Sequence, residues 1–209
     1  MIKAVLFDYD GVLADTMRDN DIAWKNAFAK QGVTLGIMEY LLLEGMTPHA
    51  IATKLTKDHG LSESVIADII EDKKKYYKEN NSFRLYPGVQ KFITSLHHRG
   101  IKLALVSGAA SHRIEEMTPK ELLVLFDVII TADDEIASKP NPDPYLKALK
   151  KIGVSANEAV VVENAPLGIQ SARAAAIYCI AVTSTLPEIV LKNADRVVQD
   201  FNELSSVIE

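Results

Sequence analysis

The chain has 209 residues, of which 48% are hydrophobic and 24% charged, and its formal net charge is −5. This length fits one domain, or a domain with a small insertion. The mild negative charge argues against a nucleic-acid partner, because phosphate backbones are bound by basic surfaces. No segment approaches the roughly 20 apolar residues of a membrane span, and the short apolar run at the N terminus does not fit a signal peptide. We therefore expect a cytoplasmic protein without a membrane partner.

Short apolar runs rich in β-formers recur along the chain. They lack the alternation of half-exposed strands, which favours strands buried on both faces, as in a parallel sheet. The runs cover residues 2–7, 101–106, 128–131, 159–162, 177–182 and, more weakly, 196–198.

Helical patterns separate these runs. One covers 89–100 and ends at Gly100, a good residue to follow a helix. Another opens with Thr118, Pro119 and Glu121, which predicts a capping box with proline at the first helical position. A third starts at Asp143 and stops at Gly153. Strand followed by helix, repeated, predicts an α/β fold with a doubly wound, Rossmann-like parallel sheet.

The region from residue 16 to about residue 82 breaks the alternation, because it has only helical patterns. We therefore expect a core domain formed by 1–15 and 83–209 and a helical cap domain formed by 16–82. Helix starts are expected at Thr47–Pro48 and Ser62, and 71–80 (EDKKKYYKEN) is interpreted as the solvated end of a helix. Because the insertion follows the first strand, it is placed to cover a site at the carboxyl ends of the strands.

The first predicted strand runs into Asp8, Asp10 and Gly11. Two carboxylates two residues apart on an extended backbone point roughly the same way, and glycine permits a sharp turn there. Close carboxylates repel each other unless a cation or a shared proton lies between them. A hard cation such as Mg²⁺ suits such oxygen ligands.

Three later strand ends also carry polar groups. Ser107 and Gly108 follow the run 101–106 and offer a hydroxyl and a backbone amide to a phosphate oxygen. Lys139 lies among prolines, which fix its loop. Glu163 and Asn164 follow the run 159–162 and offer oxygen ligands to a metal. Each signal is weak alone, but all of them lie at strand ends in a consistent order.

The segments FDYDGVLADT, VSG, KPNPDPY and VVENAPLGIQSA resemble the four motifs of the haloacid-dehalogenase-like hydrolase superfamily. The resemblance covers essentially the whole chain and is closest to the branch that holds β-phosphoglucomutase and phosphoglycolate phosphatase. The helical insertion is similar to the small cap of that superfamily.

The resemblance implies a role for each motif residue. Asp8 would attack phosphorus and form an aspartyl-phosphate, and Asp10 would act as acid and base. Lys139, with Ser107 and the Gly108 and Gly11 backbone, would bind the phosphoryl group. The cofactor would be Mg²⁺, and its expected ligands are Asp8, the Asp10 carbonyl, Glu163 and Asn164.

The sequence also departs from the family pattern. Asn164 stands where relatives commonly carry Asp, so the metal would be held more weakly. Ala176 stands where relatives often carry Gly, and a left-handed alanine would cost ~1 kcal/mol, so we expect the preceding helix to end differently. Asn20 and Pro48 occupy the places of a histidine and an arginine of β-phosphoglucomutase, which favours hydrolysis over isomerisation.

The function expected is therefore hydrolysis of a small phosphate monoester, such as a sugar phosphate, a polyol phosphate or phosphoglycolate. A phosphomutase and a catalytically weak sugar-phosphate-binding protein are the alternatives. Asn20, Thr47 and His49 are the candidate cap residues for substrate contact. The expected partner is a small phosphorylated metabolite, and the sequence leaves the oligomeric state open, a monomer included.

Overall fold

The computed structural model describes residues 2–208. Its centre is one six-stranded, fully parallel sheet in the order β3-β2-β1-β4-β5-β6. The sheet confirms the predicted fold class, and every strand overlaps a predicted apolar run. The strands are β1 (Ala4–Phe7), β2 (Lys102–Val106), β3 (Val128–Ile130), β4 (Ala159–Glu163), β5 (Tyr178–Val182) and β6 (Arg196–Val198).

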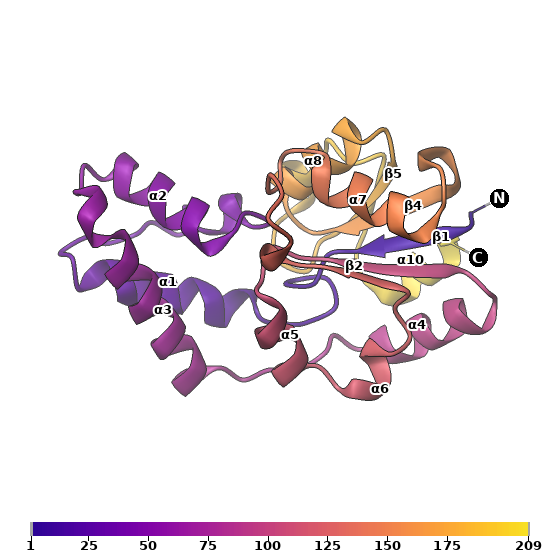
Figure 1. Ribbon diagram of the computed structural model, residues 1–209, viewed down its shortest axis with the longest axis horizontal. Helices are drawn as coiled ribbons and strands as arrows, with labels where there is room; N and C mark the ends of the chain where they lie inside the picture. Colours follow the sequence, from indigo (N-terminus) through magenta and orange to yellow (C-terminus); the bar gives the residue numbers. More distant parts are fainter. Residues whose placement is uncertain (1, 209) are drawn as a thin grey trace.

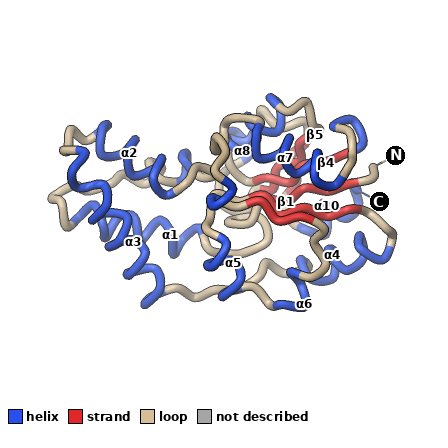
Figure 2. The backbone as a smooth tube through the Cα atoms, in the orientation of Figure 1, coloured by secondary structure: helices blue, strands red, loops and turns tan. Residues whose placement is uncertain are grey.

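Helices cover both faces of this sheet, as Figures 1 and 2 show. Alternate side chains of β1 divide between two cores, with Val5 and Phe7 on one face and Ala4 and Leu6 on the other. The first face packs against α4 (Val89–His98), α5 (Ser111–Met117), α6 (Lys120–Leu123) and α10 (Phe201–Ile208); the second packs against α7 (Asp143–Ile152), α8 (Pro166–Ala174) and α9 (Glu188–Leu191).

Two helix ends differ from their predictions. Thr118 does not cap α6: its hydroxyl shares a 2.7 Å hydrogen bond with the buried Tyr9 hydroxyl, and Pro119 precedes the helix without a side-chain cap. Ala176 does adopt the left-handed conformation, with φ of 56°, directly after α8. A tertiary contact thus takes the Thr118 hydroxyl, and the chain tolerates the strain at Ala176.

The insertion forms a layer of helices beside the sheet, drawn on the left of Figure 1. Its helices are α1 (Met17–Ala29), α2 (Pro48–Asp58) and α3 (Ile66–Asn80), with short 3₁₀ turns at Leu41–Leu43 and Glu63–Val65. They share their own apolar core, in which Trp24 and Phe28 are fully buried. Thr47 caps α2, with Pro48 at its first position, as predicted.

The predicted solvated segment 71–80 is only partly solvated. Lys73 and Tyr77 are buried, because they continue the inward face of α3 that starts with Ile66 and Ile69. Among residues 2–208, no helix has both the length and the apolar character needed to cross a bilayer.

Candidate active site

β1 lies between β2 and β4, where the strand order reverses direction, so the loops after these three strands meet at one edge of the sheet. Asp8 follows β1 directly and is 2% exposed. The buried Lys139 ammonium donates to Asp8 Oδ1 at 2.6 Å, to Glu163 Oε1 at 2.7 Å and to the Val106 carbonyl at 3.1 Å. Residues far apart in the sequence thus place the Lys139 ammonium between the Asp8 and Glu163 carboxylates.

The charges of this cluster support one another. Burial alone would lower the pKa of Lys139, but Asp8 and Glu163 outweigh it and raise that pKa, so the ammonium stays charged. Burial raises the pKa of Asp8, and Lys139 opposes that rise. Tyr145 also donates to Glu163 Oε1, at 2.7 Å.

Glu163 is held from its other side as well. The backbone N–H of Asn164 donates to Glu163 Oε2 at 3.0 Å. A Cβ at Gly168 in α8 would lie 1.8 Å from Glu163 Oε1, so only glycine leaves room for the carboxylate at the start of this helix. Both Glu163 oxygens thus accept hydrogen bonds within the site, and its expected role as an Mg²⁺ ligand stays a prediction.

Two oxygens at this edge have no hydrogen-bond partner in the described part of the chain. They are the buried Asp8 Oδ2 and Asn164 Oδ1 atoms. Buried polar atoms are rarely left unpaired, and oxygens of this kind are ligands for a hard cation. No group of three or more His, Cys, Asp or Glu side chains in residues 2–208 is placed to hold a metal. The oxygens present therefore fit a cation that takes further ligands from backbone or substrate.

Asp10 faces away from Lys139 and toward the cap. Both terminal nitrogens of Arg113, on α5, donate hydrogen bonds to the Asp10 carboxylate, one of them to Oδ1 at 3.0 Å. Thr16 donates to Oδ1 at 2.5 Å. Burial would raise the pKa of Asp10, but the charge and hydrogen bonds of Arg113 outweigh it and lower that pKa.

The predicted cap residue Asn20 lies beside this pair. Its side-chain amide donates to Asp10 Oδ1 at 3.4 Å and to the Thr16 carbonyl at 3.1 Å. Its carbonyl oxygen accepts from Lys73 of α3 at 2.6 Å. Asn20 thus connects the core carboxylate to a buried lysine of the cap.

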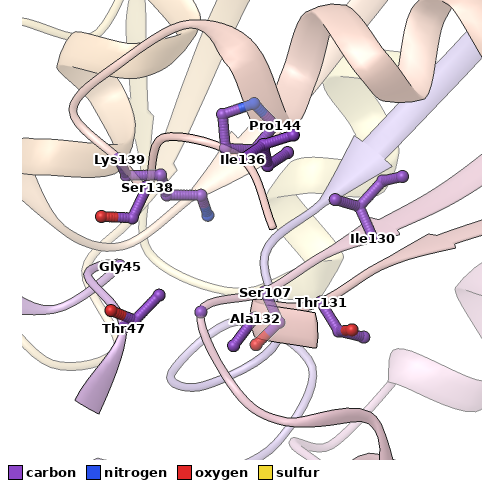
Figure 3. Close-up of a pocket in the computed structure, with 11 residues that line it drawn as sticks. Gly45, Thr47, Ser107, Ile130, Thr131, Ala132, Ile136, Ser138, Lys139 and Pro144 are labelled. Carbon is purple, nitrogen blue, oxygen red and sulfur yellow. The ribbon is translucent and has the colours of Figure 1, made fainter. Parts of the chain in front are cut away.

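A small cavity lies beside Lys139, with Ser107 and Gly108 in its wall. Figure 3 shows Gly45 and Thr47 of the cap on one side of it, and Ser107 and Lys139 of the core on the others. A Cβ at Gly108 would lie 2.6 Å from the Met46 carbonyl. The cap loop therefore lies directly against the loop that follows β2.

Two predicted residues remain, Gly11 and His49. Gly11 follows Asp10 with φ of 81°, and its carbonyl accepts from the Ser184 hydroxyl. His49 is exposed on α2 and lines neither this cavity nor the one beside Asp10. The structure thus brings together all predicted core residues and Asn20 and Thr47, but it leaves His49 outside.

Sequence reasoning missed three charged residues, Arg113, Lys73 and Glu44. Lys73 gave a signal, because it occupies a position on the inward face of α3. Glu44 gave a weaker one, as a lone acid between an apolar turn and a glycine. Arg113 gave none, because only the packing of α5 against the loop after β1 brings it to Asp10.

The model of the haloacid dehalogenase-like hydrolase family matches residues 5–182. The chain belongs to this family. Within it, the chain falls in the subfamily of β-phosphoglucomutase, phosphoglycolate phosphatase and CbbY, with an inserted helical cap.

Curated relatives cover most of this chain. Validoxylamine A 7′-phosphate phosphatase of Streptomyces hygroscopicus subsp. limoneus is 29% identical over 98% of this chain and 96% of its own. Hexitol phosphatase A of Escherichia coli is 28% identical over 97% and 93%. Protein SUPPRESSOR OF QUENCHING 1 of Arabidopsis thaliana is 32% identical over 92% of this chain, which spans only 19% of that longer protein.

Solved structures agree with this placement. A chain from Bacteroides vulgatus that carries a provisional β-phosphoglucomutase name is 33% identical, with a TM-score of 0.87 over 98% of this chain and 86% of that one. A CbbY variant from Rhodobacter sphaeroides in complex with xylulose 1,5-bisphosphate is 28% identical, with a TM-score of 0.81 over 98% and 96%. The chain is therefore a phosphatase-type member of the family.

Proposed function

We propose that this protein is an Mg²⁺-dependent phosphatase that hydrolyses the phosphate monoester of a small sugar or polyol through an aspartyl-phosphate on Asp8. The observation that carries the proposal is the Asp8 carboxylate at the end of β1. One of its oxygens is fixed by Lys139 at 2.6 Å, and the other has no partner within the described residues. The named phosphatases among the relatives support the same reaction.

In the first step, an Asp8 oxygen attacks phosphorus while the bond from phosphorus to the ester oxygen breaks, and Asp10 gives a proton to the leaving oxygen. Lys139 and the backbone amide after Ser107 neutralise the phosphoryl oxygens. The Arg113 contact occupies the Asp10 carboxylate, so it has to loosen for this proton transfer. In the second step, Asp10 takes a proton from water, which attacks phosphorus and frees Asp8.

Mg²⁺ fits beside these residues. Asp8 Oδ2 and Asn164 Oδ1 would hold it together with the Asp10 carbonyl, and when bound it would neutralise charge on the phosphoryl group. Because Asn164 carries no charge, we expect this site to need more free Mg²⁺ than a site with two carboxylates.

The test measures inorganic phosphate released from a panel of sugar and polyol phosphates, with Mg²⁺ and with a chelator. Asp8→Asn should lower the rate by at least ~10³-fold, because the amide is a poor nucleophile. Asp127→Asn is the control, since Asp127 pairs with Lys102 near the opposite edge of the sheet. A normal rate in Asp8→Asn, or isomerisation of a hexose phosphate without phosphate release, would contradict the proposal.

A further inference from the structure

A second cavity lies beside Asp10, between the cap and α5. Its cap wall includes Trp24 of α1, Tyr40 and Glu44 of the loop that follows, and Lys73 of α3. Because Asp10 is the proposed acid for the leaving oxygen, this cavity is where the alcohol part of a substrate would lie. The proposed reaction requires nothing of Glu44 or Trp24.

Glu44 is a buried carboxyl in the wall of this cavity. It is 7% exposed, and its Oε2 accepts a hydrogen bond from the Tyr40 hydroxyl. Among residues 2–208, no lysine, arginine or histidine forms an ion pair with it. A buried carboxyl without a cation costs folding free energy, so its presence in a cavity wall calls for a functional reason.

Hydrogen-bond donors lie around the same cavity. Trp24 Nε1 is buried and has no hydrogen-bond partner in the described part of the chain. Lys73 uses one of its three protons on Asn20 and lies 5.5 Å above the Trp24 ring. The wall therefore offers the Glu44 carboxyl as an acceptor and the Lys73 ammonium as a donor, a pair that suits hydroxyl groups, since each hydroxyl both donates and accepts.

The wall of this cavity carries charges of both signs. Arg113 is already neutralised by its two contacts to Asp10. Lys73 faces Glu44 across the cavity that both of them line. Lys73 and Lys74 line the cavity and form no ion pair within the described residues, so the wall carries charges of both signs, and an acidic group placed beside Glu44 would be repelled by its carboxylate.

We propose that Glu44 is a specificity-determining residue that accepts hydrogen bonds from hydroxyl groups of the leaving alcohol, so that the substrates are phosphate esters of neutral polyhydroxylated alcohols and not of hydroxy acids. This inference rests on the proposed function and narrows its substrate class. It also assigns Lys73 as a donor to the same hydroxyl groups.

The experiment compares wild type with Glu44→Gln on three substrates: a hexitol 6-phosphate, phosphoglycolate and p-nitrophenyl phosphate. Glu44→Gln should lower kcat/KM for the hexitol phosphate at least tenfold, mainly through KM, because the amide offers one acceptor oxygen and adds donors. The rate for p-nitrophenyl phosphate should stay within about twofold, since its leaving group has no hydroxyls, and that for phosphoglycolate should rise. Glu39→Gln, on the same segment and paired with His59 at the surface, is the matched control.

A second measurement needs no variant and holds if Glu44→Gln fails to fold. Wild-type kcat/KM is compared for butyl phosphate and for a tetritol phosphate of the same chain length, and we expect at least a tenfold preference for the tetritol ester. Equal rates on the two esters, or an equal loss on all three substrates in a folded Glu44→Gln, would overturn the inference and leave the phosphatase proposal intact. Failure of the wild type to release phosphate from any ester with Mg²⁺ would instead refute the proposed function.

Discussion

The Lys139 ammonium illustrates how single residues at this site depend on one another. It is 1% exposed and donates to Asp8, to Glu163 and to the Val106 carbonyl. A buried lysine of this kind stays charged only because two carboxylates surround it. Asp8 (the proposed nucleophile), the Lys139 ammonium and the Glu163 carboxylate therefore act as one unit.

Ala176 provides a test at the scale of one residue. It is exposed and follows α8 with φ of 56°, where an L side chain is strained. Ala176→Gly should raise the free energy of unfolding by ~1 kcal/mol, because the glycine removes this strain. Denaturant unfolding of the two proteins measures the change.

Gly153 is the matched control for Ala176. It follows α7 with φ of 70°, and a Cβ there would contact nothing within 4 Å. Gly153→Ala should therefore lower the free energy of unfolding by a similar ~1 kcal/mol. If Ala176→Gly destabilised the protein, a contact of the alanine methyl group would outweigh the strain.

At the scale of elements, α5 connects the core to the cap. Its Arg113 holds Asp10 and lies 5.6 Å from the rings of Tyr9 and Tyr77, the latter on α3 of the cap. The Arg113 side chain thus contacts both Asp10 (the proposed acid) in the core and Tyr77 in the cap.

Removing Arg113 should leave a buried carboxylate without its cation. Arg113→Met is expected to lower the free energy of unfolding by about 3 kcal/mol. The double variant Asp10→Asn with Arg113→Met should recover part of this loss, because no buried charge is left unpaired. Chemical denaturation of the four proteins gives the coupling.

Arg84 is the control for this cycle. It pairs with Asp15 at the surface, so Arg84→Met should leave the free energy of unfolding nearly unchanged. Additive effects of the Asp10 and Arg113 changes would contradict the assignment of this pair as a coupled buried contact.

At the scale of the whole molecule, the boundary between cap and core contains buried ionisable groups. Burial, with a contribution from Asp10, raises the pKa of Glu44 to about 7. Burial and the charge of Arg113 lower the pKa of Lys73 to about 7. Tyr40 on the same loop donates a hydrogen bond to Glu44, and the charge of Glu44 also acts on Asp8.

The raised pKa of Glu44 predicts a pH dependence of stability. The Glu44 carboxyl of the folded protein keeps its proton up to about pH 7, whereas the unfolded chain releases it near pH 4.5. The contribution of this proton to the free energy of unfolding is therefore fully present below pH 4.5 and is lost as the pH rises through about 7. From pH 5 to pH 8, wild type should lose on the order of 2 kcal/mol relative to Glu44→Gln. The lowered pKa of Lys73 acts in the opposite direction, but only above pH 7 and in both proteins.

Thermal unfolding of wild type and Glu44→Gln at a series of pH values measures this difference. A difference in the free energy of unfolding that is constant from pH 5 to pH 8 would show that Glu44 does not titrate as expected. The comparison within a pair of proteins removes the contributions of the groups that do not interact with Glu44.

The sequence by itself determined the sheet and the core of the site. Buried parallel strands need continuous apolar runs, and such runs marked every strand. Polar residues directly after those runs, such as Asp8, Ser107 and Glu163, had to meet at one edge, because parallel strands share the direction of their carboxyl ends.

Only the tertiary structure decided which groups complete the site. Arg113, Lys73 and Glu44 lie on α5, on α3 and in a cap loop, and they reach Asp10 or its cavity through packing between layers. Local sequence patterns do not encode such packing, because a lysine on a charged helix is predicted to be solvated unless the buried face of that helix is known. The proposed nucleophile Asp8 could thus be identified from the sequence, whereas the contact of Arg113 with Asp10 and the wall of the cavity beside Asp10 depend on how cap and core pack together.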